Sequence, residues 1–346
     1  MKKIISLLLA TMMVISLVAC GGSNTASSTT NTSEPAKKEA KDYKVVGLLS
    51  GVITDNGWNQ SCYEALMELN KSFGVKVEYL ENIAVSDMEE QIRAYGAEKY
   101  DMVIVHGSQF QTVAEDCAGD YPDTKFCLSY GFKVGKNNET SVKIKDLPNL
   151  AYVGPVDMGV AVGGIMGILT ETNKVVFLGG QDIPAITDCV SGVKPGVALT
   201  NPDCQVETNY IGTLTDADLA KEMTFTYLDN GFDVVSASAN SAQLGCLHAA
   251  EERGKYALGF LGDQYSVAPN AVVISVMRNY SSIYKDIFKS LVDGNWKNGP
   301  VIYGLKDNGT KVSDWHGWDQ KLPKEKVDKI NQFITDLFNG KYEGKY

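Results

Sequence analysis

Polar and aromatic side chains gather in this sequence where apolar, strand-like runs end. Trp58 is the aromatic member, and it follows the run Lys44 to Leu49 and the turn residues Asp55 and Asn56. An aromatic face beside amides and carboxylates suits a flat, hydrogen-bonding heterocycle, and it suits a stacked sugar almost as well. Packing of Trp58 within the fold is the alternative interpretation. The candidate ligand-binding residues of this kind are Asp55, Asn56, Trp58, Asn59, His106, Gln109, Tyr130, Gln181, Asp182, Asn240 and Asp263.

Side chains typical of catalytic sites are sparse. The three histidines are His106, His248 and His316, and GxSxG, HExxH, Walker and GxGxxG sequences are all missing. His106 ends a strand-like run, where a ligand contact and a structural role are equally compatible with the pattern. The cysteines show no CxxC spacing, which argues against zinc. We therefore expect a binding protein rather than an enzyme, with no cofactor and no metal.

The elements that must position these residues alternate between strand and helix. Short turns separate them, which predicts right-handed crossovers and parallel sheets covered on both faces. Two successive α/β series with a short return are typical of two lobes that close over a ligand about a hinge. Residues 158–169 are apolar all round and rich in glycine, which predicts a buried helix packed closely through its glycines. The expected strands are 44–49, 75–82, 101–106, 125–130, 150–156, 174–178, 205–211, 233–236, 256–261, 271–277 and 301–305.

The amino-terminal segment predicts export and anchoring. Lys2 and Lys3 precede an apolar stretch that closes with Leu17-Val18-Ala19-Cys20, a sequence that resembles a bacterial lipobox. We expect residues 1–19 to be a signal peptide and Cys20 to carry lipid, which holds the chain at a membrane without spanning it. Residues 20–41 are mostly small and polar, as in a flexible tether. The predicted location is extracytoplasmic, on the bacterial cell membrane.

Composition narrows the range of partners. The formal charge is −10, and loss of the two signal lysines lowers it by two, to −12. An acidic chain without a basic stripe argues against a nucleic-acid partner. Six cysteines remain besides Cys20, and a globule of this size does not need disulfides, so buried free thiols are favoured over a disulfide framework.

Several short motifs, taken in order behind the lipobox, resemble the BMP (basic membrane lipoprotein, PnrA-like) family of ABC-transporter substrate-binding lipoproteins. The resemblance covers essentially all of the chain beyond the tether. Its motifs are Asp55-Asn-Gly-Trp-Asn-Gln60, Leu80-Glu-Asn82, Pro122 with Lys125-Phe126, Gly179-Gly-Gln-Asp-Ile-Pro184, Asn201-Pro202 and Gly262-Asp-Gln264. The resemblance implies a type I periplasmic-binding-protein fold, an α/β fold of two doubly wound lobes joined by a strand-crossing hinge. Expected lobes are 42–152 plus 274–296, and 153–273 plus 297–346.

The resemblance also implies a ligand and a partner, namely a purine base or nucleoside and an ABC permease. Trp58 stands at the family's stacking aromatic, and Asp263 stands near its ribose site. This chain departs from the family at four places: Tyr130 replaces a base-reading acid, Leu214 a second aromatic, Leu261 a ribose-binding acid, and Arg278 a lysine. These departures leave room for a free base, a sugar or another ring compound, serving either uptake or a membrane sensor.

Overall fold

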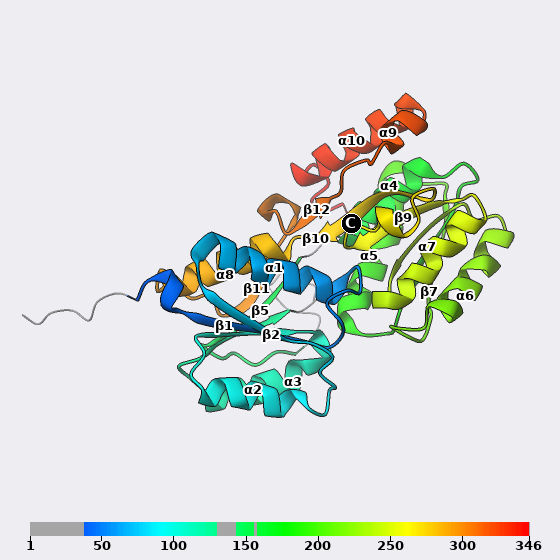
Figure 1. Ribbon diagram of the computed structural model, residues 1–346. Helices are drawn as coiled ribbons and strands as arrows, with labels where there is room; N and C mark the ends of the chain where they lie inside the picture. Colours follow the sequence, from blue (N-terminus) through cyan, green and yellow to red (C-terminus); the bar gives the residue numbers. More distant parts are fainter. Residues whose placement is uncertain (1–37, 130–142, 156–157, 346) are drawn as a thin grey trace, which may run out of the picture. The chain divides into compact units, whose positions relative to one another are not determined.

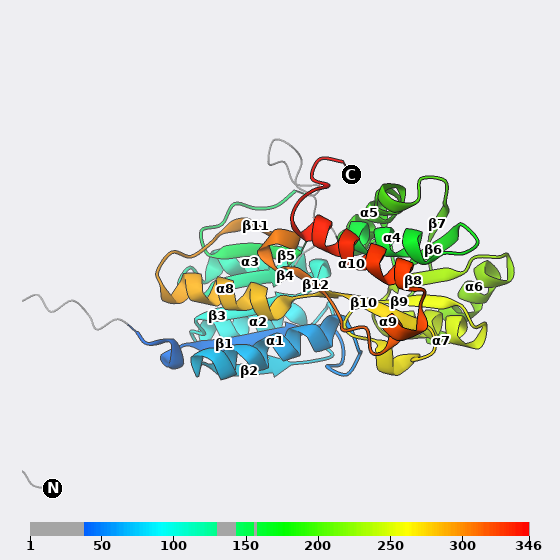
Figure 2. The ribbon, with the colours of Figure 1, turned by 90° about the horizontal axis from the view of Figure 1, so that it is seen from above.

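The computed structural model describes residues 38–129, 143–155 and 158–345, which contain two six-stranded sheets (Figures 1 and 2). The strands are β1 (Lys44–Leu49), β2 (Lys76–Leu80), β3 (Met102–His106), β4 (Lys125–Ser129), β5 (Leu150–Pro155), β6 (Lys174–Gly179), β7 (Gln205–Tyr210), β8 (Val234–Ser238), β9 (Tyr256–Leu261), β10 (Val272–Arg278), β11 (Gly299–Tyr303) and β12 (Thr310–Val312). The first sheet has the order β11-β5-β4-β3-β1-β2 and is parallel throughout. The second has the order β12-β10-β9-β8-β6-β7 and is parallel except for the edge strand β12.

Each sheet has one point where the direction of winding reverses. In the first sheet the chain passes from β1 outward to β2 and then returns to β3 on the other side of β1. The second sheet repeats this path with β6, β7 and β8. Loops that follow the two strands at such a point diverge, which opens a crevice at the carboxyl ends of the strands.

Helices cover both faces of each sheet. Figure 1 shows α1 and α8 on one face of the first sheet and α2 and α3 on the other, while α6 and α7 lie together on the second sheet. The helices are α1 (Trp58–Phe73), α2 (Met88–Ala97), α3 (Gln111–Asp120), α4 (Met158–Leu169), α5 (Pro184–Thr200), α6 (Ala217–Asp229), α7 (Gln243–Glu252), α8 (Tyr280–Val292), α9 (Trp318–Lys321) and α10 (Lys324–Phe338), with 3₁₀ turns at Ala40–Asp42, Ser108–Phe110, Asn240–Ala242, Tyr265–Val267 and Leu305–Asp307.

The apolar side chains form one large core and two smaller ones. The large core includes residues of both sheets and of α1, α4, α5, α8 and α10. The smaller cores lie under α2 and α3 in the first lobe and under α6 and α7 in the second. The near-continuous apolar strands fit this arrangement, because parallel strands are buried on both faces.

The late strands belong to lobes other than those expected. Boundaries at 274 and 297 would place most of β10 in the first lobe and β11 in the second. Strand pairing places them the other way: β10 pairs with β9 in the second sheet, and β11 pairs with β5 in the first. The chain therefore passes between the lobes after β5, between β10 and α8, and between β11 and β12. Three crossings at one side of two lobes are a suitable hinge.

The glycine-rich segment 158–169 forms the buried helix α4, as expected. Its glycines allow α4 to approach α5 closely: a Cβ at Gly163 would lie 2.2 Å from the carbonyl oxygen of Val193. We predict that Gly163→Ala lowers the free energy of unfolding by about 1–3 kcal/mol, because the backbones must separate.

Urea unfolding of Gly163→Ala beside Gly119→Ala checks this prediction. Gly119 lies in helix α3, and a Cβ there meets no atom within 4 Å. Gly119→Ala is expected to leave the stability unchanged or to raise it by about 0.5–1 kcal/mol. Equal effects of the two substitutions would contradict close packing of α4 on α5.

All six cysteines beyond the tether are free thiols, five of them buried and Cys204 half-buried, as favoured from the composition. No helix in the described ranges is long and apolar enough to cross a membrane. The described residues also hold no group of three or more side chains suited to a metal ion.

Candidate functional site

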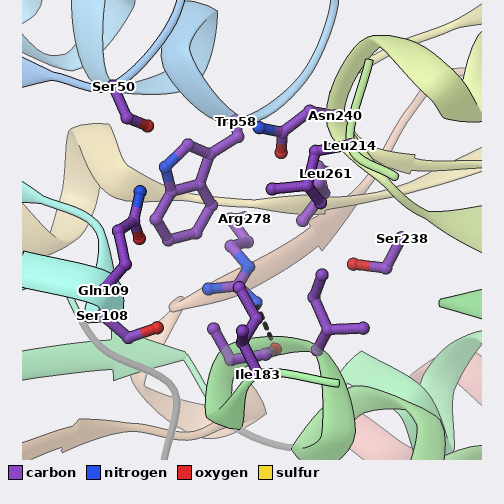
Figure 3. A pocket seen from close by; sticks show the side chains of 12 residues that line it. Ser50, Trp58, Ser108, Gln109, Ile183, Leu214, Ser238, Asn240, Leu261 and Arg278 are labelled. Carbon is purple, nitrogen blue, oxygen red and sulfur yellow. Dashed lines mark hydrogen bonds between the residues drawn. The ribbon is translucent and has the colours of Figure 1, made fainter. Parts of the chain in front are cut away.

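A pocket lies at the carboxyl ends of the strands and is lined by residues of both lobes (Figure 3). Most of its residues end or follow strands beside the two reversal points or belong to the first turns of α1 and α5, and two others end the strands β9 and β10. They are Ser50, Trp58, Ser108, Gln109, Ile183, Ala185, Ile186, Leu214, Ser238, Asn240, Leu261 and Arg278. This is the position at which doubly wound sheets bind small ligands.

Trp58 is held rigidly at the wall of this pocket. It is the first residue of α1 and is 7% exposed. One ring contact is with the imidazole of His106, stacked with centroids 4.1 Å apart, and another is with Tyr280, edge-on at 5.8 Å. The indole N–H donates to the backbone carbonyl of His106 at 3.4 Å. Contacts on ring, edge and N–H together leave the indole little rotational freedom.

Asp55 and Asn59 support Trp58 from behind, and neither lines the pocket. The Asp55 carboxylate is 4% exposed and accepts hydrogen bonds from the backbone N–H groups of Gly57, Asn59 and Gln60 at 2.9–3.1 Å. It also accepts one from the side-chain amide of Asn59 at 2.8 Å, and Asn59 in turn accepts from the N–H of Gly51 at 3.1 Å. A carboxylate at this place satisfies N–H groups that the first turn of a helix leaves unpaired.

His106 also lies behind Trp58 rather than in the pocket. It is fully buried, and its Nε2 lies 2.9 Å from the carbonyl oxygen of Trp58. Its Nδ1 lies 2.9 Å from both the Ser129 and the Tyr284 hydroxyls, which also contact each other. Burial is the main reason that the pKa of His106 is lowered to about 3. The hydrogen bond to the Trp58 carbonyl acts to raise this pKa, and the charge of Arg278 lowers it by a smaller amount. The imidazole is therefore neutral: Nε2–H donates to the carbonyl, and Nδ1 accepts from a hydroxyl.

This buried neutral histidine predicts a specific loss of stability in acid. Its pKa falls from 6.5 to about 3 on folding, so the unfolded chain binds a proton that the folded chain excludes between these values. The neutral imidazole of His106 contributes fully to the free energy of unfolding above about pH 6.5. This contribution is lost as the pH falls toward 3, at about 1.4 kcal/mol per pH unit. Urea unfolding of wild type and His106→Gln at several pH values between 7 and 4.5 should show a shallower slope in the variant. Equal slopes would contradict the neutral assignment.

Arg278 ends β10 and reaches the same pocket. It is 4% exposed, and its Cζ lies 4.9 Å from the ring centre of Trp58. The guanidinium donates to the Tyr280 hydroxyl at 3.2 Å and, at 3.5 Å, to the Ala185 carbonyl and the Cys189 sulfur. Burial acts to lower its pKa, but Tyr280 and Cys189 hold the pKa above its usual value, so the group stays charged. Its Nε has no partner in the described part of the chain.

Three of the eight non-glycine residues with positive φ in the described part of the chain lie at or near the pocket. Leu261, at the end of β9, has a φ of 77°, in the left-handed region that leucine rarely adopts. Asn240 and Asn56 have φ values of 44° and 53°, which asparagine tolerates better. Non-glycine residues held in this region cluster at binding sites. Leu261 also stands at the position where the family resemblance implies an acid, so the wall of the pocket is apolar there.

A second, larger cleft of about 240 Å³ adjoins the pocket and shares Leu261 and Arg278 with it. Asn56 and Asp263 line this second cleft rather than the pocket. The Asp263 carboxylate lies 2.8 Å from Nε2 of His316.

The structure thus brings together only part of the predicted set. Trp58, Gln109, Leu214, Asn240 and Arg278 share the pocket. Gln181 and Asp182 are exposed on the loop after β6 and line neither cavity, and Tyr130 lies outside the described residues.

Sequence reasoning missed the small lining residues. Ser50, Ser108 and Ser238 end or follow strands, which is the signal that marked the larger polar groups. Serine at such a place is too common to stand out. The hydroxyls of Ser108 and Ser238 both point toward the middle of the pocket (Figure 3).

The pocket is small in this conformation. Its free volume is about 30 Å³, which is room for a few water molecules at most and well below that of sites for small organic ligands. The two lobes touch beside it, where the Gln264 side chain donates to the carbonyl of Asn56 at 3.0 Å. A ring compound therefore enters only if the lobes separate or the lining side chains move.

Two doubly wound lobes, three crossings and a pocket between strand ends define a type I periplasmic-binding-like fold. A solute-binding protein of an ABC transporter system from Aeropyrum pernix has this fold with a TM-score of 0.73, at 20% identity over 86% of this chain and 92% of that one. The chain matches the model of the family described as ABC transporter substrate-binding protein PnrA-like over residues 43–340, and it belongs to that family.

Curated relatives span most of the chain. An uncharacterised lipoprotein of Pyrococcus abyssi is 27% identical over 97% of this chain and 85% of its own length. A purine-binding protein of Brucella abortus is 23% identical over 86% of this chain and 83% of its own length. The family is one of binding proteins that deliver ligands to permeases, not of enzymes.

Proposed function

We propose that this protein captures a purine base, a nucleoside or a closely related flat heterocycle between its lobes and delivers it to an ABC permease. The observation that carries the proposal is the fixed indole of Trp58 at a pocket formed by strand ends of both lobes. A rigid aromatic ring binds a flat heterocycle with little loss of conformational freedom. The name of the Brucella abortus relative supports a purine.

Capture follows from the position of the pocket between lobes. Trp58 and Gln109 belong to the first lobe, whereas Leu214 and Asn240 belong to the second. A ligand that contacts both sets binds the closed form more tightly than the open form, and this difference shifts the equilibrium toward closure. The amides of Gln109 and Asn240 would read the polar edge of the ring.

Membrane attachment through Cys20 completes the proposal. This cysteine follows Leu17-Val18-Ala19 and precedes a tether of small polar residues, all outside the described part of the chain. We predict that Cys20→Ala abolishes incorporation of labelled fatty acid into the protein. Equal labelling of the variant and the wild type would contradict lipid anchoring.

A thermal-shift screen of residues 38–346, a single compact unit, tests the ligand class. The panel holds purine bases, nucleosides, flavins, sugars and amino acids. A ligand at a hundredfold its dissociation constant stabilises the folded form by about 2.7 kcal/mol. We expect a response to purines that is absent in Trp58→Ala and retained in Trp296→Ala, because Trp296 lines neither cavity. A response confined to sugars or amino acids would overturn the purine proposal.

A further inference from the structure

Arg278 differs from the other two arginines of the chain. Arg93 and Arg253 are more than a third exposed and pair with carboxylates, Arg93 with Glu89 and Asp120 at 2.7–2.8 Å and Arg253 with Asp229 at 2.8 Å. Arg278 is 4% exposed, and no carboxylate in the described part of the chain pairs with it. Its neighbours are neutral acceptors and an aromatic ring, and its Nε lacks any partner there.

The pocket itself supplies no compensating charge. Arg278 is the one ionisable side chain among the twelve lining residues, which include no carboxylate. The two nearby acids of the predicted site are engaged elsewhere, Asp55 with the start of α1 and Asp263 with His316. Taking a guanidinium out of water without an anion is strongly unfavourable.

A second unpaired donor lies in the same pocket. The hydroxyl of Ser108 is buried in a side chain that is 8% exposed, and it has no hydrogen-bond partner in the described residues. Figure 3 shows this hydroxyl directed toward the space beside Arg278. Other buried atoms of the described chain, such as the Thr310 hydroxyl, are unpaired as well, but only these two donors lie at one cavity beside a charge that lacks a counter-ion. An acceptor supplied by a ligand would pair both.

We infer that the ligand of this pocket is an organic anion, a flat ring whose negative group binds the guanidinium of Arg278 and the hydroxyl of Ser108 while the ring stacks on Trp58. This inference rests on the proposed capture of a heterocycle and narrows it to a charged member of that class. A ring carboxylate, a phosphate and an ionised ring oxygen share the required chemistry. Each accepts two hydrogen bonds from an arginine fork.

Calorimetric titration of the full mature chain in detergent, with three matched pairs of probes, tests the inference. The pairs are uracil and orotate, guanosine and guanosine monophosphate, and hypoxanthine and urate, which represent the carboxylate, the phosphate and the ionised ring. We expect the anion of at least one pair to bind about 100-fold more tightly than its neutral partner. The pair that responds identifies the source of the charge.

Substitutions of Arg278 separate a ligand contact from a structural role. Arg278→Met should lower the affinity for the anion far more than the affinity for its neutral partner, and Arg278→Lys should keep part of the preference. The control Arg253→Met should change neither. Because Arg278 has no carboxylate partner, Arg278→Met should leave the unfolding temperature of the empty protein equal or raise it.

Three results would overturn the inference. The first is that the neutral member of each pair binds as tightly as its anion and that Arg278→Met does not change the ratio of the two affinities. The ligand would then be a neutral heterocycle, and the proposed function would stand. A large fall in the unfolding temperature of Arg278→Met would assign the arginine to the fold instead. If no ring compound binds, charged or neutral, the proposed function fails and the inference fails with it.

Discussion

Replacement of Trp58 by alanine is expected to weaken ligand binding by about 2–4 kcal/mol, or roughly 30- to 1000-fold, the effect of removing a central aromatic contact. The indole lines the pocket and is held in place by His106 and Tyr280. Its loss therefore removes a stacking surface that is already fixed in position before the ligand binds. Calorimetric titration with the ligand found in the screen measures this loss.

Stability must be separated from binding in this experiment. Trp58 is 7% exposed, and truncation of a buried tryptophan costs about 3–5 kcal/mol of folding stability. Trp58→Phe keeps an aromatic face and should retain most of the affinity, while circular dichroism confirms that each variant is folded at the titration temperature. A folded Trp58→Ala with wild-type affinity would contradict a ligand platform at this residue.

Asp55→Ala is expected to lower the free energy of unfolding by about 2–4 kcal/mol. The carboxylate accepts four hydrogen bonds at the start of α1, three of them from backbone N–H groups. Alanine leaves these donors buried and unpaired, at about 1 kcal/mol or more for each. Trp58 is the first residue of the same helix, so ligand affinity should fall as well.

Urea unfolding and titration of Asp55→Ala beside Asp55→Asn check this account. Asparagine retains one acceptor oxygen and should lose roughly half as much stability. The matched control is Asp216→Ala at the start of α6, where the carboxylate accepts a single N–H from Leu219 at an exposed site. A loss no larger than that of the control would show that Asp55 does not organise the helix start.

The repeated units of the fold were predictable because each depends on local pattern. The strand 44–49 and the helix 158–169 have the bounds that their apolar runs indicated. The lobe to which a late strand belongs depends instead on pairing between residues far apart. β10 and β11 are both short apolar runs, and only their partners, β9 and β5, distinguish them. Periodicity carries no information about that choice.

The site shows the same division between local and long-range information. Sequence reasoning placed His106 at a strand end and Asp55 and Trp58 in the segment that follows a strand, where they lie. It did not distinguish a side chain that faces the pocket from one that faces the backbone behind it, because both occupy the same loops. That distinction depends on hydrogen bonds such as those of Asp55 to α1. The lack of a carboxylate partner for Arg278 in the described part of the chain likewise depends on contacts between residues far apart in the sequence.

Solution X-ray scattering of residues 38–346, with and without a saturating ligand from the screen, tests capture between closing lobes most directly. The pocket between the touching lobes has a free volume of only about 30 Å³, and the proposed capture requires the empty protein to open, admit a ring compound and close around it. The account predicts a smaller radius of gyration with ligand than without it, and no such change for Trp58→Ala at the same ligand concentration. An unchanged radius of gyration in wild-type protein that calorimetry shows to be fully occupied would contradict it.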